Sequence, residues 1–198
     1  MRLGAAALIA IACVTGAGAL SLRLPESTPF FIQDGKGVPG FAPPDRELAR
    51  WALDAWSRES GGKLKFVEAK SVEAALVRLR WISAHEGLFG ETQRVQVGGR
   101  EGALVFVMPE VSQLGEPLAG LAVRDRLLRD AIVYLTCVHE LGHAVGLPHT
   151  RNFQDIMYSF GYGGDPAQIA RAYPALFESS GSWLRRGFWY TEAEQTAA

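Results

Sequence analysis

Cysteine is scarce in this sequence, since only Cys13 and Cys137 occur among 198 residues. Cys13 lies in an N-terminal apolar segment that we expect to be removed. Cys137 would then be the single cysteine of the mature chain, which excludes an intramolecular disulfide. Because Cys137 falls in a strongly apolar helical run, we expect a small buried hydrophobic residue there and not a catalytic thiol. The core must hold together by packing alone.

An excess of charge of either sign is also missing. The 20 lysine and arginine residues nearly balance the 21 aspartate and glutamate residues, for a formal net charge of −1. This balance gives no electrostatic basis for binding nucleic acid or a membrane surface, and a peptide or protein substrate fits better. Apolar residues make up 48% of the chain, enough for one well-buried core. We therefore expect a single domain that is a monomer.

The N-terminal segment has the pattern of a secretory signal peptide. Arg2 precedes an apolar stretch at 3–14 that is too short to span a bilayer and is followed by small residues at 17–19. We predict a signal peptide at 1–19 and a secreted or periplasmic domain at 20–198. In a second interpretation, Ile11-Ala12-Cys13 makes Cys13 the lipid-modified first residue of a protein anchored at the cell envelope.

The rest of the chain alternates strand and helix patterns. Strand patterns fall at 30–32, 63–68, 75–83, 94–97 and 103–108, and helical spacing falls at 45–60 and about 123–145. Asp45 is expected to cap the first helix after two prolines. This order predicts an α+β fold, with a mixed twisted β-sheet and two main helices in an N-terminal subdomain to about 146. A smaller, irregular C-terminal subdomain at about 147–198 is expected to contain a short helix at 166–173.

The second main helix ends in a string with the spacing of a tetrahedral zinc site, His139-Glu140-Leu141-Gly142-His143-Ala144-Val145-Gly146-Leu147-Pro148-His149. Histidines at i and i+4 share a helix face, so His139 and His143 can reach one ion at about 2.0 to 2.1 Å. Gly146 can adopt the left-handed backbone that ends the helix and brings His149 to the ion from another side. Three neutral imidazoles leave one coordination position open for a water that ionises near neutral pH. Glu140 is placed to act as its general base.

A methionine follows the third histidine within Asp155-Ile156-Met157-Tyr158, where a tight turn could set an apolar floor beneath the ligands. The string and Met157 together resemble the signature and Met-turn of the metzincin zinc endopeptidases, and most resemble the matrixin-type catalytic domain. Thr150 is similar to the serine that usually follows the third histidine in matrixins. Astacins typically carry a glutamate there, and adamalysins an aspartate.

The resemblance covers about residues 28–173 and implies a metzincin-like fold with zinc endopeptidase activity. It also implies an edge strand, at 94–97, that binds extended substrate by strand addition, and a pocket below the zinc for which Tyr158 is a candidate lining residue. The chain departs from the matrixin pattern because no cysteine between residue 20 and Cys137 could form a thiol switch. His85 is the one other histidine, so we predict one zinc ion, and no acidic calcium loop is evident.

Three other interpretations stay open. A buried helix with incidental histidines must explain the three histidines, Glu140, Gly146 and Met157 together, which disfavours it. A zinc-bearing peptide-binding protein without turnover would have no chemical need for Glu140, although the aromatic residues at 183–190 could cover its cleft. A zinc hydrolase acting on a non-protein amide, such as a cell-wall crosslink, would have the same ligands and a different pocket.

Overall fold

The computed structural model describes residues 24–83, 89–151 and 155–158. Its elements in chain order are β1 (Ser27–Ile32), α1 (Asp45–Glu59), β2 (Lys65–Glu68), β3 (Val77–Trp81), β4 (Gly90–Val97), β5 (Arg100–Val107), a 3-10 turn η1 (Val111–Gln113), α2 (Leu118–Arg124) and α3 (Arg126–Ala144). The predicted signal peptide with Cys13, the residue His85, the helix predicted at 166–173 and the aromatic C-terminal tail lie outside the described residues.

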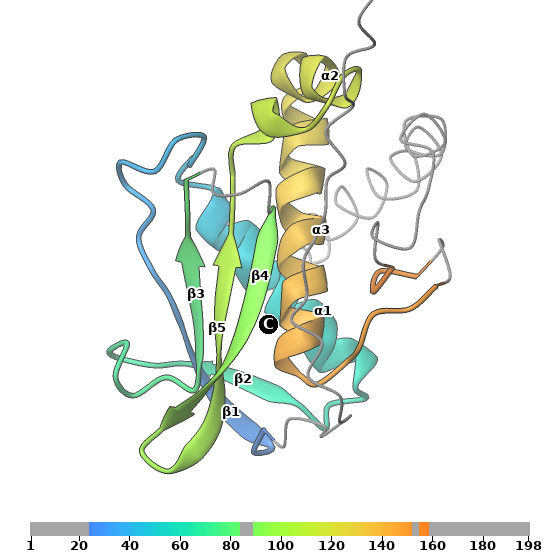
Figure 1. Ribbon diagram of the computed structural model, residues 1–198. Helices are drawn as coiled ribbons and strands as arrows, with labels where there is room; N and C mark the ends of the chain where they lie inside the picture. Colours follow the sequence, from blue (N-terminus) through green and yellow to red (C-terminus); the bar gives the residue numbers. More distant parts are fainter. Residues whose placement is uncertain (1–23, 84–88, 152–154, 159–198) are drawn as a thin grey trace, which may run out of the picture.

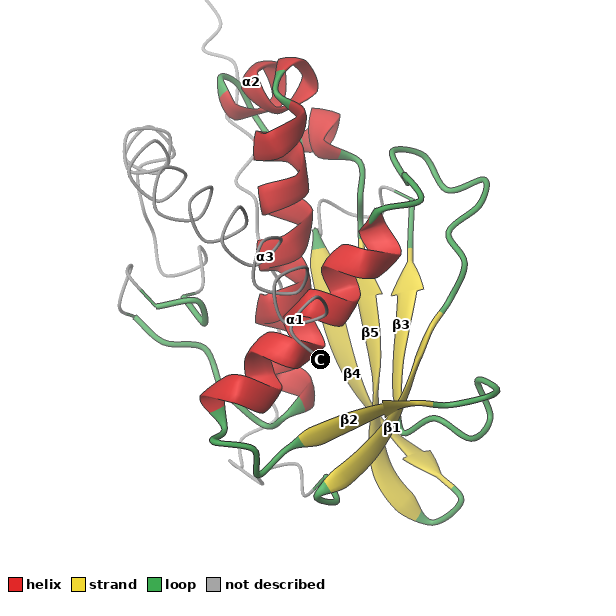
Figure 2. Cartoon of the chain, turned by 180° about the vertical axis from the view of Figure 1, so that it is seen from behind, coloured by secondary structure: helices red, strands yellow, loops and turns green. Residues whose placement is uncertain are grey.

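The strands form one five-stranded sheet in the order β2-β1-β3-β5-β4. β1 pairs in parallel with β2 and β3, and β3 with β5, whereas β4 is antiparallel to β5 and lies at the edge of the sheet. The two long helices, α1 and α3, cover one face of this sheet (Figures 1 and 2). The predicted α+β fold with a mixed sheet and two main helices is confirmed.

The main core lies between the sheet and the two long helices. Alternate residues of the inner strands point toward the helices, as period-two burial requires, while apolar residues at helical spacing on α1 and α3 meet them. The buried residues of this cluster include Leu79, Trp81, Val105, Val107, Leu48, Leu53, Val133, Cys137 and Leu141. Cys137 is fully buried, and burial raises the pKa of its thiol well above the usual range, as expected for an inert packing residue.

Several predicted elements differ from the structure. β1 begins at Ser27 and not at residue 30, and β5 begins at Arg100 and not at residue 103. β4 begins at Gly90 and not at residue 94. The helix predicted at about 123–145 is interrupted at Asp125, whose extended backbone ends α2 and whose carboxylate accepts hydrogen bonds from the backbone N–H groups of Leu127 and Leu128 at the start of α3. The prediction of Asp45 as an N-cap was wrong, because Asp45 is the first residue of α1 and its carboxylate binds the backbone N–H of Ala42 and the guanidinium of Arg129.

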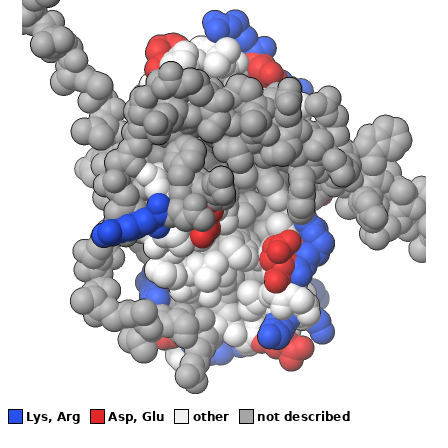
Figure 3. All heavy atoms as spheres, turned by 90° about the vertical axis from the view of Figure 1, so that its right-hand side faces the viewer, with Lys and Arg blue, Asp and Glu red and all other residues white. Residues whose placement is uncertain are grey.

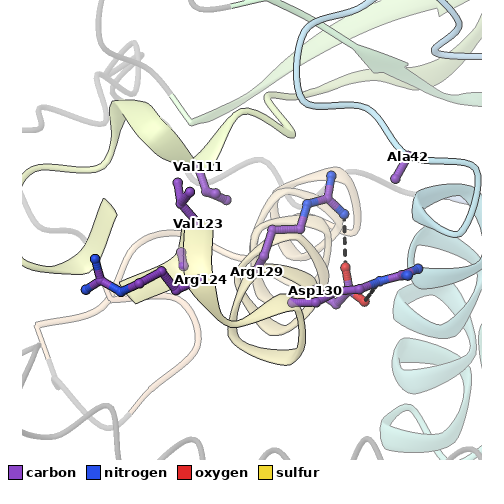
Figure 4. Close-up of a pocket in the computed structure, with 8 residues that line it drawn as sticks. Ala42, Val111, Val123, Arg124, Arg129 and Asp130 are labelled. Atoms are coloured by element: carbon purple, nitrogen blue, oxygen red, sulfur yellow. Dashed lines mark hydrogen bonds and ion pairs between the residues drawn. The ribbon is translucent and has the colours of Figure 1, made fainter. Parts of the chain in front are cut away.

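A pocket of about 330 Å³ lies at the start of α3, beside this ion pair (Figure 4). Its lining includes Arg129 and Asp130, which bond to each other at 3.1 Å. Asp130 precedes His139 by nine residues, which corresponds to about 14 Å along a helix axis. The pocket is therefore separate from the histidines.

Charged side chains of both signs are visible on one face of the molecule. On the face seen in Figure 3, basic and acidic side chains of the described residues are interspersed and form no patch of one sign. No helix within residues 24–83, 89–151 and 155–158 is long and apolar enough to cross a membrane.

Candidate active site

Three imidazoles converge at the C-terminal end of α3. His139 and His143 lie one helical turn apart on the same face, and His149 approaches from the segment that follows. The Nε2 atom of His149 is 3.2 Å from Nε2 of His139 and 3.1 Å from Nε2 of His143. Among the described residues, these three form the group whose ligand atoms lie close enough together to hold a metal ion.

The end of α3 explains how His149 reaches the other two. Gly146 has a φ of +97°, in the region that favours glycine. The N–H of Leu147 donates to the carbonyl of Gly142 at 2.9 Å, and the N–H of Gly146 donates to the carbonyl of His143 at 2.9 Å. This pair of bonds is the Schellman motif, which stops a helix and turns the chain back across it. The turn predicted at Gly146 is confirmed.

Two backbone carbonyls determine which nitrogen of each helical histidine carries the proton. Nδ1 of His139 lies 2.6 Å from the carbonyl of Ile156, and Nδ1 of His143 lies 2.8 Å from the carbonyl of Leu147. A carbonyl only accepts, so each Nδ1–H is the donor and the Nε2 lone pair of the neutral ring is available. The imidazoles are orientated for metal binding through Nε2.

Burial favours the neutral form of all three rings. It lowers the pKa of His139 and of His143, and it lowers that of His149 to about 4, with a further contribution from repulsion by the other two histidines. Neutral imidazole is the form that coordinates metal ions. Burial and the hydrogen bonds at Nδ1 thus both favour a neutral imidazole whose Nε2 atom can bind a metal ion.

The donor set fits a zinc ion. Nε2 of His149 lies 3.2 Å from Nε2 of His139 and 3.1 Å from Nε2 of His143, so the lone pairs of these atoms point toward each other. A proton on Nε2 of His149 could form a hydrogen bond to only one of the other two atoms. A cation between them removes the repulsion. Tetrahedral zinc bonded at about 2.0 to 2.1 Å holds its nitrogen ligands about 3.3 to 3.4 Å apart, close to the spacing here.

Met157 lies in a tight turn beneath α3. The carboxylate of Asp155 accepts the N–H of Met157 at 2.9 Å, and the carbonyl of Asp155 accepts the N–H of Tyr158 at 3.0 Å. Met157 is buried, and a Cβ atom added to Gly142 would lie 2.4 Å from its Sδ atom. The absence of a side chain at Gly142 therefore lets the methionine pack directly against the helix.

This turn also supports the histidines. The carbonyl of Ile156, within the turn, accepts the Nδ1–H of His139. The carbonyl of Met157 accepts the N–H of Thr150 at 2.8 Å, which ties the residue after His149 to the same turn. Tyr158 is half-buried and forms a parallel bridge with Thr150. Its role as a pocket residue stays a prediction.

Glu140 is buried between α3 and the edge strand. Its side chain is 2% exposed, and Oε2 accepts a hydrogen bond from the hydroxyl of Thr92 at 2.8 Å. Burial raises the pKa of Glu140 to about 7, although the bond from Thr92 opposes this and the nearby Glu91 adds to it. A carboxyl group with such a pKa can both accept and release a proton near neutral pH.

Two residues that contact Glu140 were not anticipated from the sequence. Thr92 binds its carboxylate, and a Cβ atom added to Gly90 would lie 2.5 Å from its Cγ and Oε1 atoms. Both belong to the first half of β4, where the sequence shows no apolar alternation. The strand was therefore expected to begin only at residue 94. A glycine whose missing side chain makes room for another element gives no local signal.

Fold and site together define a sheet-and-helix domain with three histidines that could hold a metal ion and a buried carboxylate. Two solved structures are similar to it. Metalloproteinase-II from Bacteroides fragilis is 16% identical with a TM-score of 0.40, and the match covers 71% of this chain and 50% of that one. Archaemetzincin from Methanopyrus kandleri is 18% identical with a TM-score of 0.39, and the match covers 73% and 84%.

The chain spans about half the length of the Bacteroides protein. No family model and no curated protein matches the sequence. Both structural likenesses are remote.

Proposed function

We propose that this chain is a zinc-dependent endopeptidase of the metzincin type. The observation that carries the proposal is the convergence of three histidine Nε2 atoms, two of them on the helix that also carries the buried Glu140. His139, His143 and His149 would hold one zinc ion, and Glu140 would be the general base. A three-histidine set that leaves one position open is typical of catalytic and not of structural zinc.

Zinc, when bound, supplies positive charge that polarises a carbonyl and lowers the pKa of water at its open position. Glu140 takes a proton from the attacking water as the new C–O bond forms. It returns a proton to the amide nitrogen as the C–N bond breaks, so the products are a carboxylic acid and an amine. Burial of Glu140 raises its pKa, whereas the positive charge of a bound zinc ion would favour the carboxylate form that accepts the proton.

The edge strand supports an extended peptide as the substrate. β4 is at the edge of the sheet and lies beside α3, with Thr92 in contact with Glu140. A peptide added as a further strand would be held by main-chain hydrogen bonds next to the candidate base. Such binding is independent of the ends of the substrate, which fits an endopeptidase.

The finer assignments rest on the sequence. Thr150 and the segment Asp155-Ile156-Met157-Tyr158 support a matrixin-like subtype, with Tyr158 in the wall of the substrate pocket. The pattern at 1–19 supports a protein secreted or exported to the periplasm, with a lipid anchor at Cys13 as the alternative. Mass spectrometry of the mature N-terminus separates the two, because a signal peptide cleaved after Ala19 leaves a start at residue 20.

Metal analysis combined with cleavage of an unbiased peptide library tests the proposal. The wild-type protein should hold one zinc ion per chain and cleave peptides. Glu140→Ala should keep the zinc and lose about 10²- to 10⁴-fold in kcat, the usual contribution of a general base. Glu47→Ala, which removes an exposed carboxylate of α1, is the matched control and should keep full activity.

The outcomes separate the alternatives. The peptidase proposal fails if the wild-type protein holds one zinc ion but cleaves no peptide that Glu140→Ala leaves intact. Peptide binding without turnover would then favour a binding protein. Hydrolysis of a cell-wall crosslink that depends on Glu140 would favour a hydrolase of non-protein amides.

A further inference from the structure

Thr92 faces the helices from the edge strand. In the antiparallel ladder Thr92 lies opposite Val105, and Gly90 lies opposite Val107. Directly opposed residues project from the same face of a sheet, and the two valines belong to the core that includes α3. The side of β4 that carries Gly90 and Thr92 is therefore the side that faces α3.

The Thr92 hydroxyl lies within reach of two oxygens of one residue. It is 2.8 Å from Oε2 of Glu140 and 2.8 Å from the backbone carbonyl of Glu140. The hydroxyl has one hydrogen, so it can donate to only one of these acceptors at a time. A bond to the carbonyl would join β4 to α3, whereas a bond to Oε2 holds the carboxylate itself.

Gly90 restricts the carboxylate from a second direction. The site of its missing Cβ is 2.5 Å from both Cγ and Oε1 of Glu140, so the side chain of Glu140 occupies the space that a residue with a side chain would fill. A buried carboxylate also requires a hydrogen-bond donor, since it is shielded from water. Thr92 supplies that donor, and Gly90 supplies the room.

We propose that Thr92 is a positioning residue for Glu140, because its hydroxyl holds Oε2 of the carboxylate from the edge strand. This inference rests on the proposed peptidase function. Because Thr92 belongs to the strand proposed to bind the peptide, the same bond sets the base relative to the substrate strand. A displacement of about 1 Å in such a group can cost about 100-fold in rate.

The test compares Thr92→Val, which removes the hydroxyl at nearly constant shape, with Thr92→Ser, which retains it. Both are made in the full-length, zinc-loaded protein. Thr136→Val is the matched control, because the hydroxyl of Thr136 donates to the carbonyl of Ile132 at 2.9 Å within the same helix. A hydrogen bond to a charged group is worth about 1.5 to 3 kcal/mol, so Thr92→Val should lower kcat about 10- to 100-fold.

The change should fall on kcat with KM and zinc content unchanged, and Thr92→Ser should restore kcat to within a few fold. A second measurement does not depend on turnover: the carboxyl ¹³C resonance of Glu140, assigned by its loss in Glu140→Ala. It should shift in Thr92→Val and stay in place in Thr92→Ser and Thr136→Val.

An unchanged resonance and wild-type kcat in Thr92→Val would overturn the proposal. So would equal losses in Thr92→Val and Thr92→Ser, or a loss confined to KM, since either indicates strand packing alone. If wild type cleaves no peptide, the proposed function has failed. The resonance then decides by itself whether Thr92 holds the carboxylate.

Discussion

The buried ion pair between Asp45 and Arg129 should be a main source of stability for the helix that carries the histidines. The carboxylate is 0% exposed and the Arg129 side chain is 12% exposed. The guanidinium binds both carboxylate oxygens, with Nη2 at 2.7 Å from Oδ2, and also donates to the carbonyl of Gly40 at 2.6 Å. The pair joins the starts of α1 and α3.

Arg129→Met keeps most of the side-chain length and removes the charge. It leaves the Asp45 carboxylate buried without its cation, which typically costs about 3 to 5 kcal/mol. The double variant Arg129→Met/Asp45→Asn removes both charges. Its loss in free energy of unfolding should be smaller than the summed losses of the two single variants by more than about 1 kcal/mol. Urea unfolding followed by circular dichroism gives the free energy of unfolding of each variant.

Arg50→Met is the matched control. The side chain of Arg50 is 31% exposed and pairs with Glu68, which is 45% exposed, so its loss should cost only about 0.2 to 1 kcal/mol. Arg129→Met and Arg50→Met should both hold as much zinc as the wild-type protein, since neither ion pair lies near the histidine ligands. If Arg129→Met costs no more than Arg50→Met, the inference that burial makes this pair important is wrong.

Three further predictions concern the site. Zinc at about 100 times its Kd should stabilise the protein by about 2.7 kcal/mol, so a chelator should lower the Tm by about 5 to 10 °C. The same drop in Tm in a His149→Ala variant would contradict the assigned ligands. Gly146→Ala should cost about 1 to 2 kcal/mol in unfolding experiments and weaken zinc binding by calorimetry, because φ is +97°; unchanged zinc affinity would show that His149 does not depend on this turn. Gly90→Ala should keep its zinc and lose peptidase activity, because the added Cβ occupies the space of Glu140; full activity would contradict the close contact.

The fold was largely predictable because apolar periodicity reports which face of each element is buried. The strands at β3 and β5 and the two long helices follow from that pattern alone. The pattern was misleading where a polar residue has a tertiary partner. Asp45 was expected to serve as a cap, but an arginine 84 residues away binds its carboxylate.

The break before α3 was missed for a different reason. Asp125 lies inside an apolar pattern that runs through both α2 and α3, and nothing in the spacing marks its extended backbone. The first half of β4 was missed because Gly90 and Thr92, which face α3, are not apolar residues, so no apolar alternation begins there.

The sequence by itself determined the metal ligands as candidates, because the i, i+4 spacing of His139 and His143 and the helix stop at Gly146 are local properties of eleven consecutive residues. Only the tertiary structure decided the state of Glu140. Its burial, its raised pKa and its bond to Thr92, 48 residues earlier in the chain, depend on how α3 packs against the edge strand. Helical spacing acts over a few residues, whereas the position and protonation of this carboxylate result from packing across the whole domain.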